Sequence, residues 1–360
     1  MRIGIVGLPN AGKSSLFNAL TRAGAAAASY PFTTVEPNVA VVPVPDDRLD
    51  AVAETVGATP VVPETIAFHD IAGLVRGASR GEGLGNRFLA NVRETDAIVH
   101  VVRAHGDEQV PHPEGRVDPV ADVETIETEL LLADLEQAER RLERVARQAK
   151  SGEAATVAEE AWLRELVVAL GGGHRARSVP PPAAAPEALR ALSPLTAKPV
   201  LYVANVGEDG SAEAPPELAS RAEGTGAGVL AVSARLEAEL AELDAAEAAA
   251  MRAELAAGES GLARLVRAAF ELLELISFFT AGQAREARAH ATKRGTTAWG
   301  AAGKIHSDIQ RGFVRAEVVA WDELVAAGGY AGARERATLR LEGRDYTVRD
   351  GDVMTVRFTP

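Results

Sequence analysis

Uninterrupted apolar runs recur along the first two thirds of the chain, separated by polar, glycine-rich or helical segments. Such runs are typical of strands buried on both faces of a parallel sheet. They predict strands over residues 2–6, 39–44, 65–70, 97–103, 199–204 and 229–233. Because helical segments such as 16–20 and 261–275 alternate with these strands, we expect an α/β fold that binds ligands at the carboxyl ends of its strands.

A different periodicity begins at Asp122. From there to Lys150, apolar residues recur at steps of three and four with charged residues between them, which predicts a long amphipathic helix. A second helical run continues to Leu170, and the glycines at 171–173 end it. Two helices joined by a short polar turn predict an antiparallel hairpin. We interpret it as an inserted arm; the alternative is a pair of surface helices packed on the sheet.

From Ile276 onward the pattern changes to short strand-like runs with glycine-rich turns, which indicates a small β-rich domain. The predicted strands cover residues 278–280, 312–319, 338–341, 345–348 and 353–358. The chain therefore divides into a main α/β domain, an arm with a proline-rich return, and a C-terminal domain. Their expected bounds are 1–121 with 196–276, 122–195, and 277–360.

Composition narrows the class of protein. The 360 residues include no cysteine and no apolar run of eighteen residues, and no basic and apolar leader precedes the first strand, so we expect a cytoplasmic protein. A formal net charge of -13 argues against a general nucleic-acid coat, which needs a cationic surface. Residues 281–360 carry 13 Lys and Arg against 10 Asp and Glu, so only this end has a charge balance that permits RNA contact.

The first strand leads into a phosphate-binding loop. Glycines at positions 7 and 12, followed by Lys13 and Ser14, match the P-loop spacing, in which backbone N–H groups surround an anion. We expect Lys13 on the β/γ-phosphate oxygens and the Ser14 hydroxyl on Mg²⁺. The residues expected to contact nucleotide here are Asn10, Ala11, Gly12, Lys13, Ser14 and Ser15. A glycine-rich turn between unrelated elements is the alternative; the order strand, loop, helix favours the P-loop.

Two later segments match the nucleotide switches of P-loop proteins. The loop at 30–38, with prolines and no periodicity, is where a threonine hydroxyl reaches Mg²⁺, and we choose Thr34 with Thr33 in reserve. Asp70 ends an apolar strand, where such enzymes place the carboxylate that orders Mg²⁺. Gly73 follows and is expected to offer its N–H to the γ-phosphate.

Base recognition is expected at two further strand ends. GTPases select guanine with an Asn-Lys-x-Asp motif, whereas here Asn205 is followed by Val206 and Glu208. Adenine lacks the guanine donors that the aspartate would accept, and the Asn205 amide matches adenine N6 and N7, so we expect ATP to bind at least as well as GTP. Ser233 and Ala234 close the next strand, where base-binding loops lie in this fold.

Five motifs together resemble one family. They are GLPNAGKSS at 7–15, PFTT at 31–34, DIAGLVRGAS at 70–79, NVGE at 205–208 and AAGKIH at 301–306. This set is similar to the YchF branch of Obg-related P-loop proteins, the Obg-like ATPases. The resemblance covers essentially the whole chain. It implies a P-loop nucleotide domain, a coiled-coil insertion, a β-grasp-like C-terminal TGS domain, ATP hydrolysis, and ribosome association in translation or stress.

The catalytic expectations follow from the same resemblance. In Ras-like enzymes a glutamine near the Asp-x-x-Gly motif orients the attacking water, but here that position is Leu74, which cannot hydrogen bond. The resemblance places His112 in that role, with Lys13 as the other catalytic residue. Asn10 occupies the position where several related proteins hold K⁺ beside the phosphates.

Three functional interpretations are considered. The first is an ATP-hydrolysing switch read by the ribosome or its RNA; the others are a GTP-dependent Obg-type factor and a nucleotide-sensing adaptor with incidental turnover. Base preference separates the first two, and turnover with and without ribosomes separates the third. We expect a monomer that binds neither membranes nor DNA.

Overall fold

A computed structural model describes residues 1–27, 38–71, 84–106, 110–113, 115–208, 213–255, 258–282 and 285–359. The chain forms two compact units. The first contains Met1–Ala23, Val35–Ala40 and Ala67–Leu262, and the second contains Gly24–Thr34, Val41–Ile66 and Ala263–Pro360. Within the described ranges, no helix is both long enough and apolar enough to cross a membrane.

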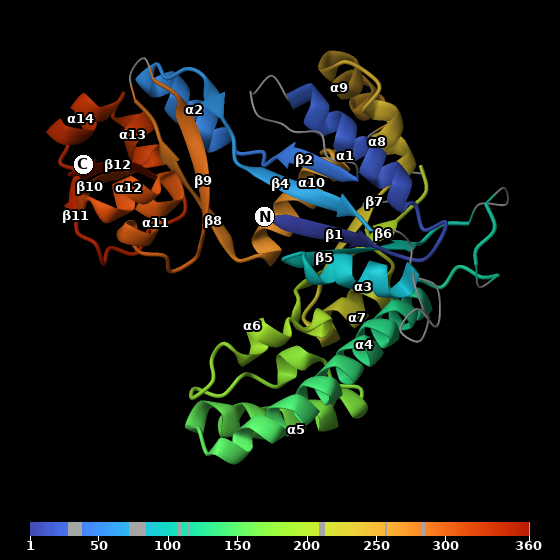
Figure 1. The fold of residues 1–360 in the computed structure, drawn as a ribbon. Coiled ribbons are helices and arrows are strands. Elements are labelled where there is room, and N and C mark those ends of the chain that lie inside the picture. Colours follow the sequence, from blue (N-terminus) through green and yellow to red (C-terminus); the bar gives the residue numbers. More distant parts are fainter. Residues whose placement is uncertain are drawn as a thin grey trace. The chain divides into compact units, whose positions relative to one another are not determined.

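The first unit is built on a six-stranded sheet with strand order β2-β4-β1-β5-β6-β7 (Figure 1). The strands are β1 Arg2–Val6, β2 Val39–Pro43, β4 Thr65–Asp70, β5 Ala97–Arg103, β6 Val200–Asn205 and β7 Gly228–Val232. The pairs β4/β1, β1/β5, β5/β6 and β6/β7 are parallel. Every residue of β5 is buried, as its uninterrupted apolar run predicts. The predicted parallel α/β sheet is therefore confirmed.

Helices join and cover these strands. They are α1 Lys13–Ala27, α3 Leu84–Arg93, α4 Pro119–Gln148, α7 Pro216–Thr225, α8 Ala234–Leu240, α9 Ala245–Glu254 and α10 Gly261–Leu272. Phe88, Leu89 and Val92 of α3 pack with Ile126 and Leu130 of α4 in a buried cluster that also contains sheet residues. The start of α4 thus belongs to the core of this unit.

The remainder of α4 forms the predicted hairpin with α5, Ala154–Gly171 (Figure 1). The hairpin has a core of its own, in which Trp162, Leu163 and Leu166 pack against Ala138 and Val145. The proline-rich return after α5 packs on it as well, because Val179 is buried in the same cluster and its carbonyl accepts a hydrogen bond from Trp162 Nε1 at 3.0 Å. Short helical segments follow at η2 Ala176–Ser178, α6 Ala188–Leu192 and η3 Leu195–Ala197.

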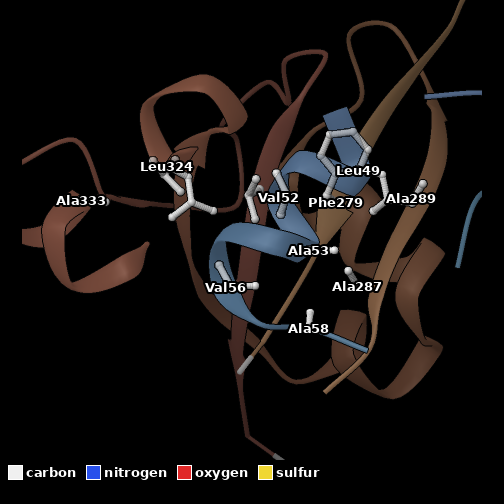
Figure 2. Packing of buried hydrophobic residues seen from close by; sticks show 12 residues of the cluster. Leu49, Val52, Ala53, Val56, Ala58, Phe279, Ala287, Ala289, Leu324 and Ala333 are labelled. Atoms are coloured by element: carbon white, nitrogen blue, oxygen red, sulfur yellow. The ribbon is translucent and has the colours of Figure 1, made fainter. Parts of the chain in front are cut away.

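The second unit has a six-stranded mixed sheet of order β11-β10-β12-β8-β9-β3. Its strands are β3 Val61–Val62, β8 Leu275–Thr280, β9 Ala287–Lys293, β10 Phe313–Ala320, β11 Arg340–Glu342 and β12 Asp352–Phe358. Its helices are α2 Asp47–Val56, α11 Ala298–Ile305, α12 Ser307–Arg311, α13 Trp321–Ala326 and α14 Tyr330–Glu335. Figure 2 shows Leu49, Val52 and Val56 of α2 packed with Phe279 and Leu324.

Helix α2 and strand β3 differ from expectation, because they were expected in the first domain. β3 pairs in parallel with β9, with Val61 opposite Ala287, and α2 fills the core shown in Figure 2. Their contacts therefore place them in the second unit. The expected bounds at 121, 196 and 276 remain a proposal for the functional domains.

In the C-terminal part, one predicted strand was wrong and one observed strand was missed. The expected strand at 345–348 makes only an isolated bridge, between Thr347 and Thr297. Strand β9 was missed because alanines carry much of its buried side, so the sequence lacks a strong apolar alternation.

Candidate nucleotide-binding site

The carboxyl ends of five parallel strands meet at one edge of the first sheet. Register places Asp70 beside Ile5, Asn205 beside Arg103, and Val232 beside Asn205. Each strand therefore delivers its last residue to the edge where the phosphate-binding loop leaves β1. In open parallel sheets this edge is where ligands bind.

The loop from residue 7 to residue 12 is shaped by close backbone contacts. A Cβ atom on Gly7 would lie 2.4 Å from the carbonyl oxygen of Val101, so this position requires glycine. Gly12 has a φ of +96° and Asn10 has a φ of +63°, which turn the chain sharply into α1. The loop closes with a hydrogen bond from Ala11 N to Leu8 O of 3.3 Å.

Lys13 begins α1 directly after this loop. Its side chain is buried, and its Nζ donates a hydrogen bond of 2.8 Å to Leu8 O across the loop. Burial lowers the pKa of Lys13, and the charge of Asp70 partly opposes that shift. Burial likewise raises the pKa of Asp70, and the charge of Lys13 opposes it. The two charges thus stabilise each other beside the loop.

Asn205 braces the loop from the neighbouring strand β6. It is 6% exposed; its Nδ2 donates to Ala11 O at 3.1 Å and its Oδ1 accepts from Ala234 N at 3.0 Å. A Cβ on Gly12 would lie 2.1 Å from this Nδ2, so the second loop glycine is needed because Asn205 packs against it. The amide is engaged at both ends within the protein. Each end keeps one further hydrogen or lone pair, so the expected pairing of Asn205 with adenine N6 and N7 stays a prediction.

The other residues expected to contact the nucleotide base differ in how far they are exposed. Val206 is buried in a core cluster, so only its backbone lies where a base could meet it. Glu208 is exposed and pairs with Arg235, Nε to Oε1, at 2.7 Å. Ser233 caps α8 by accepting from Leu236 N at 3.4 Å. These residues do gather at the ends of β6 and β7, as the sequence predicts.

His112 lies in the loop that follows β5. Its Nε2 is 2.9 Å from Oδ2 of Asp122, and both side chains are at most 5% exposed. Burial raises the pKa of Asp122, while its hydrogen bond with His112 opposes that shift. The loop also touches the phosphate loop, because Asn10 Nδ2 donates to Pro111 O at 3.0 Å. In this conformation His112 is therefore next to the site but held on the first turn of α4.

Comparisons with known proteins agree with this geometry. The sequence model of a family described as "50S ribosome-binding GTPase" matches residues 2–142, and the C-terminal YchF-GTPase model, described as a protein of unknown function, matches 275–359. The "Ribosome-binding ATPase YchF" of Bacillus subtilis is 49% identical over 360 residues, covering 99% of this chain and 98% of the relative. The same-named protein of Escherichia coli O157:H7 is 48% identical over 359 residues, covering 99% of each.

The chain belongs to the YchF family. A solved Schizosaccharomyces pombe structure titled as a YchF GTPase supports this, with a TM-score of 0.87, 32% identity, and coverage of 99% of this chain and 97% of that one. The sequence resemblance and the α/β P-loop fold class are thereby confirmed. The individual site residues of this YchF-family chain remain predictions.

Several predicted site residues fall outside the described ranges. They are Thr33, Thr34, Gly73 and Leu74. Of the residues expected to hold Mg²⁺, Ser14 and Asp70 are described, and Ser14 is exposed at the start of α1.

P-loop domains of this kind generally use Mg²⁺, and the donors fit it. Ser14 supplies a hydroxyl and Asp70 a carboxylate, both oxygen ligands. Among the described residues, no group of three or more His, Cys, Asp or Glu side chains is arranged to hold a metal. The ion would therefore depend on nucleotide phosphates for further ligands, which is the usual arrangement for Mg²⁺. Once bound, it would neutralise phosphate charge.

The sequence analysis did not identify two residues that lie at the site. Asp122 was considered only as the beginning of a helical pattern, although it lies ten residues after His112. Arg103 ends the buried strand β5, and it donates to His105 O at 3.0 Å and to Val110 O at 2.7 Å. An arginine closing an otherwise apolar strand was the available signal, because a buried guanidinium needs partners.

Proposed function

We propose that this YchF-family protein is an ATP-hydrolysing switch whose nucleotide state is read by the ribosome. The observation that carries the proposal is the braced phosphate loop, in which buried Lys13 and the charge of half-buried Asp70 interact at the strand ends. Relatives named ribosome-binding ATPases, alignable over 99% of this chain, support the nucleotide and the partner. We infer a cytoplasmic monomer that binds neither membranes nor DNA.

The base preference rests on the positions after Asn205. Glu208 replaces the aspartate that guanine requires, and Val206 replaces the lysine that covers the ring. The Asn205 amide keeps one hydrogen and one lone pair beyond its bonds to Ala11 and Ala234, so it can pair with adenine N6 and N7, while the backbone near 205–208 and the loop at Ser233 border the base. ATP then binds at least as well as GTP. Because the matching family model is described as a GTPase, GTP is the direct competitor to test.

Calorimetry of the purified full chain with ATP and with GTP, each with Mg²⁺, tests this preference. We expect an ATP dissociation constant equal to or lower than that of GTP. A GTP affinity about tenfold higher, equivalent to about 1.4 kcal/mol, would refute the proposal and favour the Obg-type GTP-dependent factor.

For turnover, Lys13 binds the β/γ-phosphate oxygens, and Ser14, Thr34 and Asp70 hold Mg²⁺. Gly73 offers its N–H to the γ-phosphate. Leu74 cannot orient water, so His112 leaves Asp122 and aligns the attacking water when a partner stabilises that position. Turnover without the partner is correspondingly slow.

The site at Asn10 is the proposed place for K⁺. Its amide nitrogen is engaged with Pro111 O, which orients the side chain between the phosphate loop and the His112 loop. An amide oxygen is a suitable ligand for a hard monovalent cation. A cation here would supply positive charge that an arginine provides in other switches.

Ribosome contact is proposed through the arm and residues 281–360. The latter carry more Lys and Arg than Asp and Glu, so binding should weaken as salt rises. Because β9 to β12 complete the second sheet, charge reversal at exposed Arg315 and Arg344 is a better test than deletion. We expect ATP-dependent co-sedimentation that Arg315→Glu with Arg344→Glu reduces. Co-sedimentation that ignores nucleotide, salt and these changes would contradict the contact.

A further inference from the structure

A cavity of about 480 Å³ lies at the base of the arm, inside the first unit and apart from the phosphate loop. It is bounded by the first half of α4, the return segment 173–177, the start of β6, and α7. Its volume falls in the range that small-molecule sites occupy. The walls combine apolar side chains such as Leu130 and Val200 with several charged groups.

The charged groups do not balance. Three arginines, at 175, 177 and 221, face two glutamates, at 124 and 127. Glu127 Oε1 accepts from Arg175 and from the Tyr202 hydroxyl, and its Oε2 accepts from Arg221 at 2.7 Å. Although burial opposes it, these hydrogen bonds lower the pKa of Glu127, so it stays ionised. Glu124 pairs with Arg221 at 2.9 Å.

Arg177 is the third arginine of the cavity, and the two glutamates pair with the other two arginines. In the part of the chain that the structure describes, its Nη2 has no hydrogen-bond partner although it is buried, and the same is true of Arg221 Nε. Burial, and then the neighbouring charge of Arg175, lower the pKa of Arg177. Buried donors without partners are rare in folded proteins. Two such donors on arginines of one cavity indicate a place where an acceptor with negative charge is stabilised.

We propose that this cavity binds a small organic anion, whose phosphate or carboxylate group pairs with Arg177 and Arg221 while its apolar body packs against Leu130 and Val200. Because both unpaired N–H groups are buried, the two side chains must rotate for these groups to reach the ligand. The ligand would join α4 to α7 and the return segment, and so fix the base of the arm. This site is separate from the nucleotide site, and its occupancy does not depend on ATP hydrolysis.

Calorimetry of the full chain tests the site with two probes, inorganic phosphate and citrate, each at constant ionic strength. Arg177→Gln removes the charge and keeps a polar side chain; Arg164→Gln, on the exposed face of α5, is the matched control. We expect at least one probe to bind the wild type and Arg164→Gln equally, and Arg177→Gln about tenfold more weakly or worse, as loss of one charge-assisted hydrogen bond implies. The probe that binds identifies the anionic group.

Hydrogen exchange gives the second measurement. Bound probe should slow exchange in 119–131 and 216–225 of the wild type, and not in Arg177→Gln. Arg177→Lys keeps the charge, so it should retain most of the affinity. It is the variant to measure if Arg177→Gln folds poorly. The proposal is overturned if the wild type and Arg177→Gln bind the probes with equal affinity. A probe that binds only at the phosphate loop would give this result. The absence of binding by both probes also overturns the proposal.

Discussion

Asn205→Ala tests the brace on the phosphate loop. The substitution removes two hydrogen bonds, to Ala11 O at 3.1 Å and from Ala234 N at 3.0 Å, in a position that is 6% exposed. Each bond contributes about 0.5–1.5 kcal/mol, and buried groups left without partners add to the loss. We therefore expect the free energy of unfolding to fall by about 2–3 kcal/mol.

The same substitution should weaken ATP binding, because Ala11 is part of the loop that surrounds the phosphates. Without the brace, part of the binding energy is used to order the loop, and we expect about a tenfold loss of affinity. Urea unfolding and calorimetry with ATP measure the two effects. Asn91→Ala, at an exposed position of α3, is the matched control and should change stability by about 0.5 kcal/mol or less. If Asn205→Ala has the same stability and the same ATP affinity as Asn91→Ala, Asn205 does not brace the phosphate loop.

Three further predictions concern single groups. His112→Ala should lower ribosome-stimulated turnover about tenfold or more, within the range for positioned acid–base groups, and leave ATP affinity nearly unchanged; wild-type stimulated turnover would exclude this role. Hydrolysis should be faster in KCl than in NaCl at matched ionic strength, and Asn10→Ala should lose the difference; equal wild-type rates would argue against K⁺. Burial lowers the pKa of His100 to about 4 from 6.5, so the unfolded chain binds more protons between these values and stability falls as pH drops. From pH 7 to pH 5 this costs about 2 kcal/mol, and urea unfolding of His100→Phe should show a smaller loss than the wild type; an equal loss would contradict it.

The sequence predicted those features that depend on local pattern. The apolar run at 97–103 could only be a buried strand, and the order of strand, glycine loop, lysine and helix at 2–20 fixed the phosphate loop. The two long helices of the arm followed from their periodicity. Each of these depends on residues close together in the chain.

Features that depend on distant partners were not predictable in the same way. The alanine-rich strand β9 is buried because β3 and β8 flank it, which its own sequence does not indicate. Asn205 was expected at the base, and its contacts with Ala11 and Ala234 were not foreseen because they come from two other segments of the chain. The contact between His112 and Asp122 likewise needs the loop and α4 to be placed together.

The most direct test of the account is ATP turnover by the purified full chain with and without ribosomes. We predict slow hydrolysis by the protein alone, clear stimulation by ribosomes, and loss of both activities in Lys13→Ala. Turnover that ribosomes leave unchanged would contradict a switch that the ribosome reads, and turnover that survives Lys13→Ala would contradict the phosphate loop as its site.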